Sequence, residues 1–159
     1  MKIEIKDEEV IPLSDFELNW RWDKIHNSRI SIEELKEIQP LSHDTSKKLF
    51  KVASYFESEL DLRNDYTSSD WIRASSESDD HTKEFRKKLS KLLKNWNEDL
   101  IVCWDKKTSL KTNKEIFLKY WDDFCYPSSD DLIILSVKTN WILIYNHIEV
   151  AKIWMKIDT

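Results

Sequence analysis

Glycine is missing from all 159 residues of this sequence. Phosphate-binding P-loops, dinucleotide-binding fingerprints and the nucleophile elbow of hydrolases all need glycine, because the backbone there must approach a ligand or adopt a positive φ angle. The sequence therefore excludes these three kinds of site. It also predicts that tight turns depend on Asn, Asp and Ser residues, as at Asn140 and Asn146.

Cysteine and histidine are too few and too scattered to suggest a metal centre. Cys103 and Cys125 have apolar neighbours and belong to no CxxC pair, so we expect both to be reduced and buried. No two of the four histidines stand three or four residues apart, and none lies in an HExxH-like pattern. We therefore expect no metal and no other cofactor.

Long apolar runs are also absent. No stretch approaches the roughly 20 apolar residues that a membrane span needs. The first 13 residues lack the apolar core and small-residue cleavage site of a signal peptide. We therefore expect a cytoplasmic protein with no membrane partner.

The composition nevertheless indicates a folded chain. Hydrophobic residues make up 40% of it and aromatic residues 12%, which is far more aromatic area than disordered chains carry. A chain of this length is near the usual size of one domain and buries roughly 70% of its unfolded surface on folding. No linker or internal repeat divides it, so we expect residues 1–159 to form a single domain.

Apolar residues recur at helical spacing in three stretches. These stretches are residues 44–59, 83–94 and 112–124. Capping-box patterns at Ser14, Ser31 and Thr112 each predict a helix start, and Pro40 should end the helix that Ser31 opens. The helical signals are therefore spread from the N-terminus to the middle of the second half.

Strand signals concentrate near the C-terminus. The predicted strands are residues 2–6, 100–104, 132–137, 141–146 and 150–155. The last three follow at short spacing, which predicts an antiparallel β-meander. Because helices precede most strands, we predict an α+β fold, in which a helix-rich N-terminal half is followed by a meander packed against the helices at 83–94 and 112–124.

Acidic residues are concentrated in the first half of the chain. The net charge is −5, but residues 1–80 carry 19 acidic and 11 basic residues. Such a surface suits a basic partner better than a phosphate backbone, so we expect no nucleic acid on this face. Our candidate partner-binding acids, from this region and from two later pairs, are Glu57, Glu59, Asp61, Asp65, Asp70, Asp122, Asp123, Asp130 and Asp131. A solvated loop that binds no partner would be acidic for the same reason, so this alternative stays open.

Two of the eight tryptophans are hard to place. Trp20 and Trp22 flank an arginine on a short predicted helix, where one of the two should face outward. An exposed Trp22 has the character of an interface anchor, although packing against the helix at 44–59 explains it equally well. Trp71 is instead expected to hold down the Ser- and Asp-rich surface loop at 61–80.

Two alternatives from other functional classes stay open. The carboxylates of Asp105, Asp122, Asp123, Asp130 and Asp131, with His147, suit a small hydrolase or nuclease that uses acid/base chemistry or Mg²⁺. The basic surface of the helix at 83–94 suits a nucleic-acid-binding accessory protein, although no aromatic residues are interleaved on it. Adjacent acids and a lysine-rich helix face are, however, usual on solvated surfaces.

The last third of the chain resembles small acidic bacterial proteins, some of which are identified as immunity proteins of polymorphic or contact-dependent toxin systems. The resemblance covers residues 110–131 and the strands that follow, and its pattern consists of Thr112, Phe117, Trp121, Phe124 and the Asp130-Asp131 pair. It implies a protein that binds and neutralises a cognate toxin domain without catalysis. The acidic first half agrees with this function, since a basic toxin surface would attract it.

Overall fold

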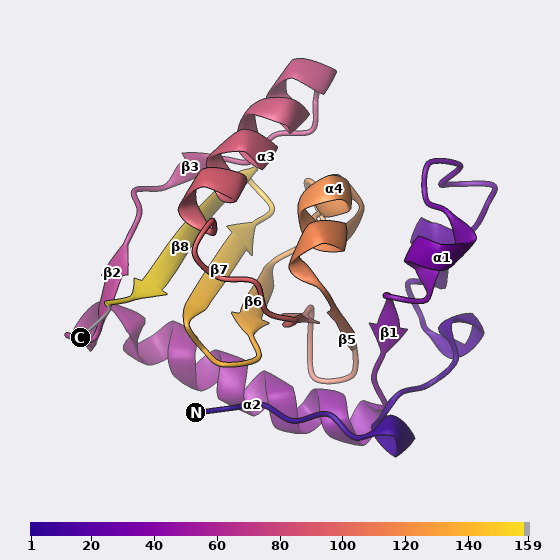
Figure 1. The fold of residues 1–159 in the computed structure, drawn as a ribbon, viewed down its shortest axis with the longest axis horizontal. Coiled ribbons are helices and arrows are strands. Elements are labelled where there is room, and N and C mark those ends of the chain that lie inside the picture. Colours follow the sequence, from indigo (N-terminus) through magenta and orange to yellow (C-terminus); the bar gives the residue numbers. More distant parts are fainter. Residues whose placement is uncertain (158–159) are drawn as a thin grey trace.

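The computed structural model describes residues 1–157, which form an eight-stranded antiparallel sheet between two helical layers (Figure 1). The strand order is β1-β5-β4-β6-β7-β8-β2, and β3 also pairs with β8. The strands are β1 (Gln39–Pro40), β2 (Tyr66–Ser68), β3 (Ile72–Arg73), β4 (Leu100–Cys103), β5 (Ser109–Thr112), β6 (Leu132–Ser136), β7 (Trp141–Asn146) and β8 (Val150–Lys156). The predicted α+β class is therefore confirmed. The predicted meander is present as β6-β7-β8, but only as part of this larger sheet.

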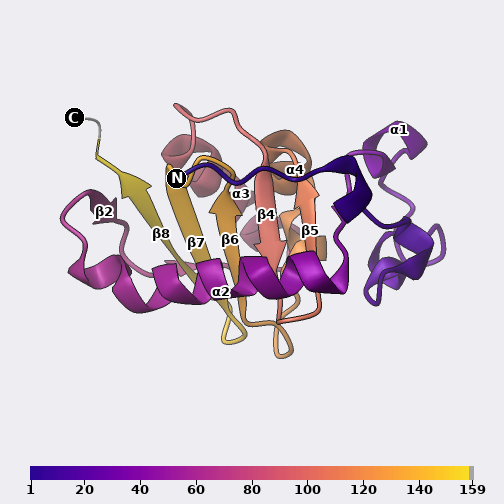
Figure 2. The same ribbon diagram turned by 90° about the horizontal axis from the view of Figure 1, so that it is seen from below.

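Helices cover both faces of the sheet, as the two-sided apolar strands require. The α-helices of the described residues are α1 (Ile32–Leu35), α2 (His43–Glu59), α3 (Asp79–Leu92) and α4 (Lys114–Phe124). Figure 2 shows α2 running across the sheet on one side, with α3 and α4 behind it on the other. None of these helices has the length and apolar composition needed to cross a bilayer.

Strand alternation divides the core into two clusters. Ile101 and Leu135 are cross-strand partners that face α2, where they pack with Phe56. Val102 and Ile134 are the next pair and face the opposite side, where they pack with the α4 residue Trp121. Because side chains alternate along a strand, consecutive apolar residues supply both cores at once. The predicted packing of the helices at 83–94 and 112–124 against the sheet is confirmed.

Several predicted details of the N-terminal region are wrong. Residues 2–6 form no strand ladder, although the Ile3 N–H donates to the Val137 carbonyl at 2.6 Å and Ile3 packs against the α2-side core. Ser14 opens no α-helix but lies within a short 3-10 helix (Leu13–Asp15), and the Glu17 carboxylate accepts a hydrogen bond from Thr108. Pro40 does not end a helix but lies in edge strand β1, a position that tolerates its missing N–H.

The other helix starts follow their capping residues more closely. Ser31 and Glu34 form the predicted capping box, with both reciprocal bonds at 3.1 Å. The cap of α4 is Asn113, one residue after the predicted Thr112, which belongs instead to β5. The turns agree with prediction only in part: Ser128 adopts a positive φ angle and the Asn146 side chain accepts from the Ile148 N–H, but Thr139 and Glu149 also adopt positive φ angles near 60°. Without glycine, the turns after β6 and β7 depend on left-handed non-glycine residues.

Short helix α1 is joined to α4 through the side chain of Glu34. The Glu34 carboxylate accepts hydrogen bonds from Lys119 and from the Tyr120 hydroxyl, both at 2.8 Å. The Lys119 hydrogen bond, followed by those from Ser31 and Tyr120, lowers the pKa of Glu34 from 4.5 to about 2. This contact therefore fixes the N-terminal region onto the α3–α4 layer.

We predict a pH-dependent contribution of Glu34 to stability. Because the folded-state pKa lies below the unfolded value, the stabilisation is complete above pH 4.5 and is lost as the pH falls from 4.5 towards about 2. Urea unfolding of wild type and Glu34→Gln across this range should give a difference in unfolding free energy that shrinks at low pH. A difference that is constant with pH would contradict the charged contact.

Candidate functional site

A groove of about 360 Å³ lies between α2 and the ends of strands β4, β6 and β7. Phe50 of α2 and Ile133 and Ile144 of the sheet give it an apolar lining. Glu57 comes from α2 and Asp131 immediately precedes β6, so two carboxylates that are far apart in sequence meet at one groove. Both side chains belong to exposed residues.

A second hollow of about 190 Å³ adjoins the first, because Trp104 and Asp131 line both. It adds the carboxylates of Glu17 and Asp105, and Glu17 accepts a hydrogen bond from the Thr108 hydroxyl at 3.4 Å. We call the two hollows together, with Glu17, Glu57, Asp105 and Asp131, the acidic groove. Its combination of apolar lining and acidic rim suits a cationic side chain with an aliphatic stem.

Trp71 is 54% exposed and does not itself line the acidic groove, but it lies near the groove through Lys152. Lys152 Nζ is 6.0 Å from the Trp71 ring centroid and 3.6 Å from the Asp61 carboxylate. Lys152 also pairs across the sheet with Ile144 of the groove. These contacts place the exposed indole near Asp61, which lies just after the C-terminal end of α2. Trp71, expected to anchor a loop, therefore extends the acidic surface with a large apolar group.

Asp131 is fixed in its carboxylate form by His147. The Asp131 Oδ1 atom accepts from the His147 backbone N–H at 2.9 Å and lies 2.8 Å from the His147 ring nitrogen Nδ1. These two bonds, the backbone bond first, lower the pKa of Asp131 below its ordinary value. The groove therefore keeps a negative charge at this position at neutral pH, and His147 orients that charge.

The other predicted acids of residues 57–80 are distributed unevenly. Asp61 accepts from the Trp154 indole N–H at 3.3 Å and contacts Lys152, while Asp65 is neutralised by Arg63 at 2.6 Å. Asp70 is exposed on the loop before Trp71, and Glu59 is half-buried. Asp61 and Asp70 therefore contribute to the surface around Trp71, whereas Asp65 is occupied by an internal partner.

Asp130 is not an open partner-binding acid. It forms a buried two-pronged ion pair with Arg21, with N–O distances of 2.7 and 3.1 Å, and the two side chains are 7% and 4% exposed. The Tyr126 backbone N–H also donates to it at 2.9 Å. The prediction for Asp130 is therefore wrong, because its charge balances an arginine that burial would otherwise leave uncompensated.

Asp122 and Asp123 also serve the fold. Asp123 is buried and accepts from Asn27 at 2.6 Å and from Arg29 at 2.9 Å, while Asp122 contacts the same Arg29 at 3.4 Å. These contacts attach residues 27–29 to α4. The prediction that Asp123 is an exposed partner-binding residue is therefore wrong, and Asp122 is engaged inside the protein.

Trp22 is 1% exposed, so its predicted role as a surface anchor is wrong. Its ring packs against Phe16, Phe124 and Trp104 on the α4 side of the sheet, and not against α2. Trp20 is the outward member of the pair, at 37% exposure. Trp20 and Trp22 therefore lie on either side of the buried Arg21, and only Trp22 reaches the aromatic residues of the core.

The carboxylates considered for hydrolysis are divided among different partners. Asp105 accepts from the Lys107 backbone N–H at 2.7 Å, and Asp131 is bound to His147. Asp122, Asp123 and Asp130 are held by Arg29 and Arg21. Within residues 1–157, no three His, Cys, Asp or Glu side chains gather as a metal site requires. Buried Cys103 is a poor nucleophile, since burial raises its pKa to about 12.

A family model described as "Protein of unknown function (DUF2947)" matches residues 10–153. The chain belongs to the DUF2947 family. The match includes the acidic groove from Glu17 to Asp131, as well as Trp71, so the groove lies within the part of the chain that defines DUF2947 membership. Neither the curated proteins nor the solved structures include a match to this chain.

Proposed function

We propose that this DUF2947 protein works by binding another protein through the acidic groove and Trp71. The observation that carries the proposal is the half-exposed indole of Trp71 near a groove whose rim carboxylates come from distant parts of the chain. Exposed tryptophans in such settings supply a large share of binding energy, while surrounding charges select and orient the partner.

The chemistry of the groove favours a basic partner. A lysine or arginine side chain has an aliphatic stem that fits the Ile133 and Ile144 lining and a cationic end that pairs with Glu57 or Asp131. The resemblance of the sequence to immunity proteins implies that this partner is a toxin domain, and we propose that the active surface of the toxin is basic. Occupation of that surface by the acidic groove then neutralises the toxin in the cytoplasm.

The proposal predicts that a neighbouring gene encodes a toxin and that the affinity for this toxin depends on Trp71. A gene product encoded directly upstream should stop growth alone and be harmless when co-expressed with this chain. Titration calorimetry of the purified pair should show that Trp71→Ala weakens binding by about 30-fold or more, because an anchor of this kind contributes about 2 kcal/mol.

Trp20→Ala is the matched control, since Trp20 is also exposed but lies outside the acidic groove, and it should leave the affinity unchanged. If neutralisation occurs but Trp71→Ala binds as tightly as wild type, the assigned surface is wrong. If no neighbouring gene product is toxic when expressed alone and harmless when co-expressed with this chain, the toxin assignment is wrong.

A further inference from the structure

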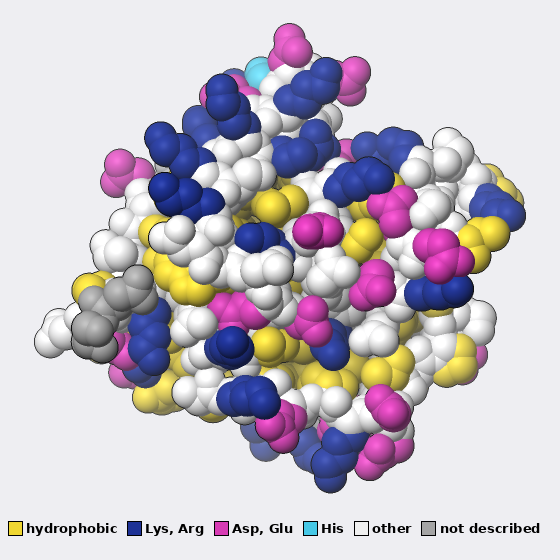
Figure 3. All heavy atoms as spheres, viewed as in Figure 1, with side chains coloured by type: hydrophobic (Ala, Val, Ile, Leu, Met, Phe, Trp, Pro, Cys, Tyr) yellow, Lys and Arg dark blue, Asp and Glu magenta, His cyan; other side chains and the backbone are white. Residues whose placement is uncertain are grey.

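Helix α3 carries a row of lysines on the side of the sheet opposite α2. Lys83, Lys87 and Lys91 repeat every four residues, about 6 Å apart along the helix, and Lys94 follows the helix end. All four are exposed, and within residues 1–157 none of them forms an ion pair, unlike Lys88, which pairs with Glu84 at 3.2 Å. Figure 3 shows Lys and Arg side chains gathered over α3, with acidic side chains at one end of the helix.

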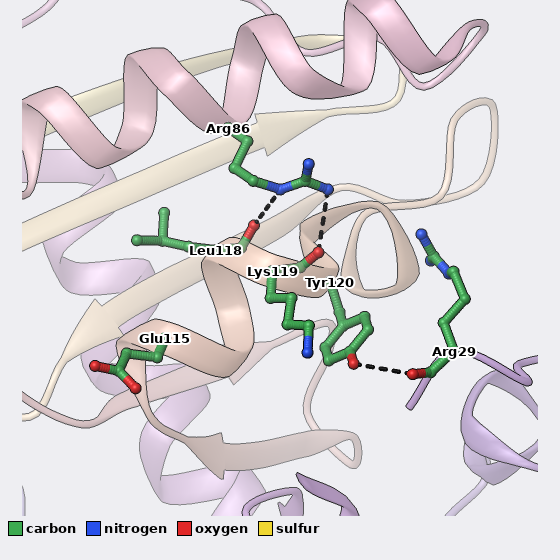
Figure 4. Close-up of a pocket in the computed structure, with 6 residues that line it drawn as sticks. All are labelled: Arg29, Arg86, Glu115, Leu118, Lys119 and Tyr120. Atoms are coloured by element: carbon green, nitrogen blue, oxygen red, sulfur yellow. Dashed lines mark hydrogen bonds between the residues drawn. The ribbon is translucent and has the colours of Figure 1, made fainter. Parts of the chain in front are cut away.

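The positive surface continues into an open hollow of about 540 Å³ between α3 and α4 (Figure 4). Arg86 donates from Nε to the Leu118 carbonyl at 2.9 Å and from Nη2 to the Lys119 carbonyl at 3.1 Å, next to the kink of α4 at Tyr120. Both acceptors are neutral carbonyls, so the guanidinium is fixed in position without losing its charge to a carboxylate. Lys119, Arg29 and Glu115 also line this hollow, but Lys119 is paired with Glu34 and Arg29 with Asp122 and Asp123, so Arg86 is the lining cation that extends the positive surface of α3.

Apolar anchors are missing from this basic surface, which distinguishes it from the surface around Trp71. The exposed large hydrophobic residues of the described chain lie outside α3 and α4. Protein interfaces need an apolar or aromatic centre, whereas contacts to a phosphate backbone are polar and strongly positive. Tyr120, the aromatic residue in the hollow, is only 2% exposed and offers no face on which an unpaired base can stack.

We infer that the surface formed by Lys83, Lys87, Lys91, Lys94 and Arg86 binds the phosphate backbone of double-stranded nucleic acid without sequence preference. The net charge of −5 includes Glu57 of α2, which lies on the other side of the sheet from this surface, whereas Asp79, Asp80 and Glu84 lie on α3 itself, towards its N-terminal half. Binding to phosphates releases counterions, so the affinity must fall steeply as salt rises. The inference does not depend on the proposed toxin partner.

The test compares two triple variants with the same change in charge. Lys83→Ala/Lys87→Ala/Lys91→Ala removes the α3 row, and Lys47→Ala/Lys48→Ala/Lys51→Ala removes three exposed lysines from α2. Fluorescence anisotropy with a short, labelled, mixed-sequence DNA duplex at low salt should show at least about tenfold weaker binding for the α3 variant. Its plot of log affinity against log salt should also lose about 2.7 units of slope, at about 0.9 for each lost phosphate contact.

The α2 variant should bind the duplex as wild type does, and circular dichroism should show that both variants remain folded. Equal losses of duplex affinity in the two variants would overturn the inference, because they would show that the duplex responds only to the total charge of the protein. Polyglutamate or phosphatidylserine vesicles bound as tightly as the duplex would also overturn it, as would tighter binding of a single strand. Since Lys83, Lys87 and Lys91 lie outside the acidic groove, this test can fail while the toxin proposal survives.

Discussion

Replacement of Trp121 by alanine is expected to lower the free energy of unfolding by about 3–5 kcal/mol. Trp121 is fully buried in α4, and its ring meets Phe85 of α3 edge to face at a centroid distance of 4.6 Å. Its indole N–H donates to the Thr82 carbonyl at 3.1 Å. The substitution therefore leaves a cavity between two helices and removes one of the hydrogen bonds that join them.

Urea unfolding at neutral pH measures this effect, with Lys87→Ala as the control. Lys87 is exposed on the same α3–α4 layer, and its truncation should change stability by less than about 0.5 kcal/mol. Similar unfolding free energies for the two variants would contradict the central position that the structure gives to Trp121.

Arg21→Met is expected to destabilise the protein by a similar amount, about 3–5 kcal/mol, because it leaves the buried Asp130 carboxylate without its cation. The guanidinium also stacks on the Tyr126 ring at 4.0 Å and donates to the Phe124 carbonyl at 3.3 Å. Loss of Arg21 therefore disturbs the attachment of the N-terminal region to the end of α4. Chemical denaturation of the variant measures the effect.

A double variant separates loss of packing from the uncompensated charge. Asp130→Asn keeps the size of the side chain and an acceptor for the Tyr126 N–H, but removes the charge. Arg21→Met/Asp130→Asn should therefore be more stable than Arg21→Met alone. If the double variant instead loses the sum of the two single effects, the two side chains do not act as a pair.

Periodicity predicted the long regular elements correctly. Leu49, Ala53 and Phe56 recur at helical spacing, and all three are buried in α2. Such patterns are local, because a helix or strand needs only its own residues to present one apolar side. Strand β5 was missed because its four residues include Ser109 and Lys111, and it exists only through pairing with β4 and β1.

The candidate site was predictable only in part. Acidity made Glu57 and Asp131 candidate binding residues, but their meeting at one groove depends on the packing of α2 across the sheet. Asp130, the neighbour of Asp131, looks identical in sequence and yet is buried against Arg21. The side chains of Asp130 and Asp131 point in different directions, and Arg21, the partner of Asp130, lies 109 residues away in the sequence.

The sequence by itself determined the α+β class, the three longer helices, the C-terminal strands and the absence of glycine-dependent sites. Tertiary structure alone decided which tryptophans are exposed, burying Trp22 and leaving Trp20 and Trp71 at the surface. The physical reason is that apolar periodicity reflects the geometry of a single helix or strand. The burial of an isolated aromatic side chain depends instead on partners that are far away in the sequence. For Trp22 those partners are Phe16, Trp104 and Phe124, which only the folded sheet brings together.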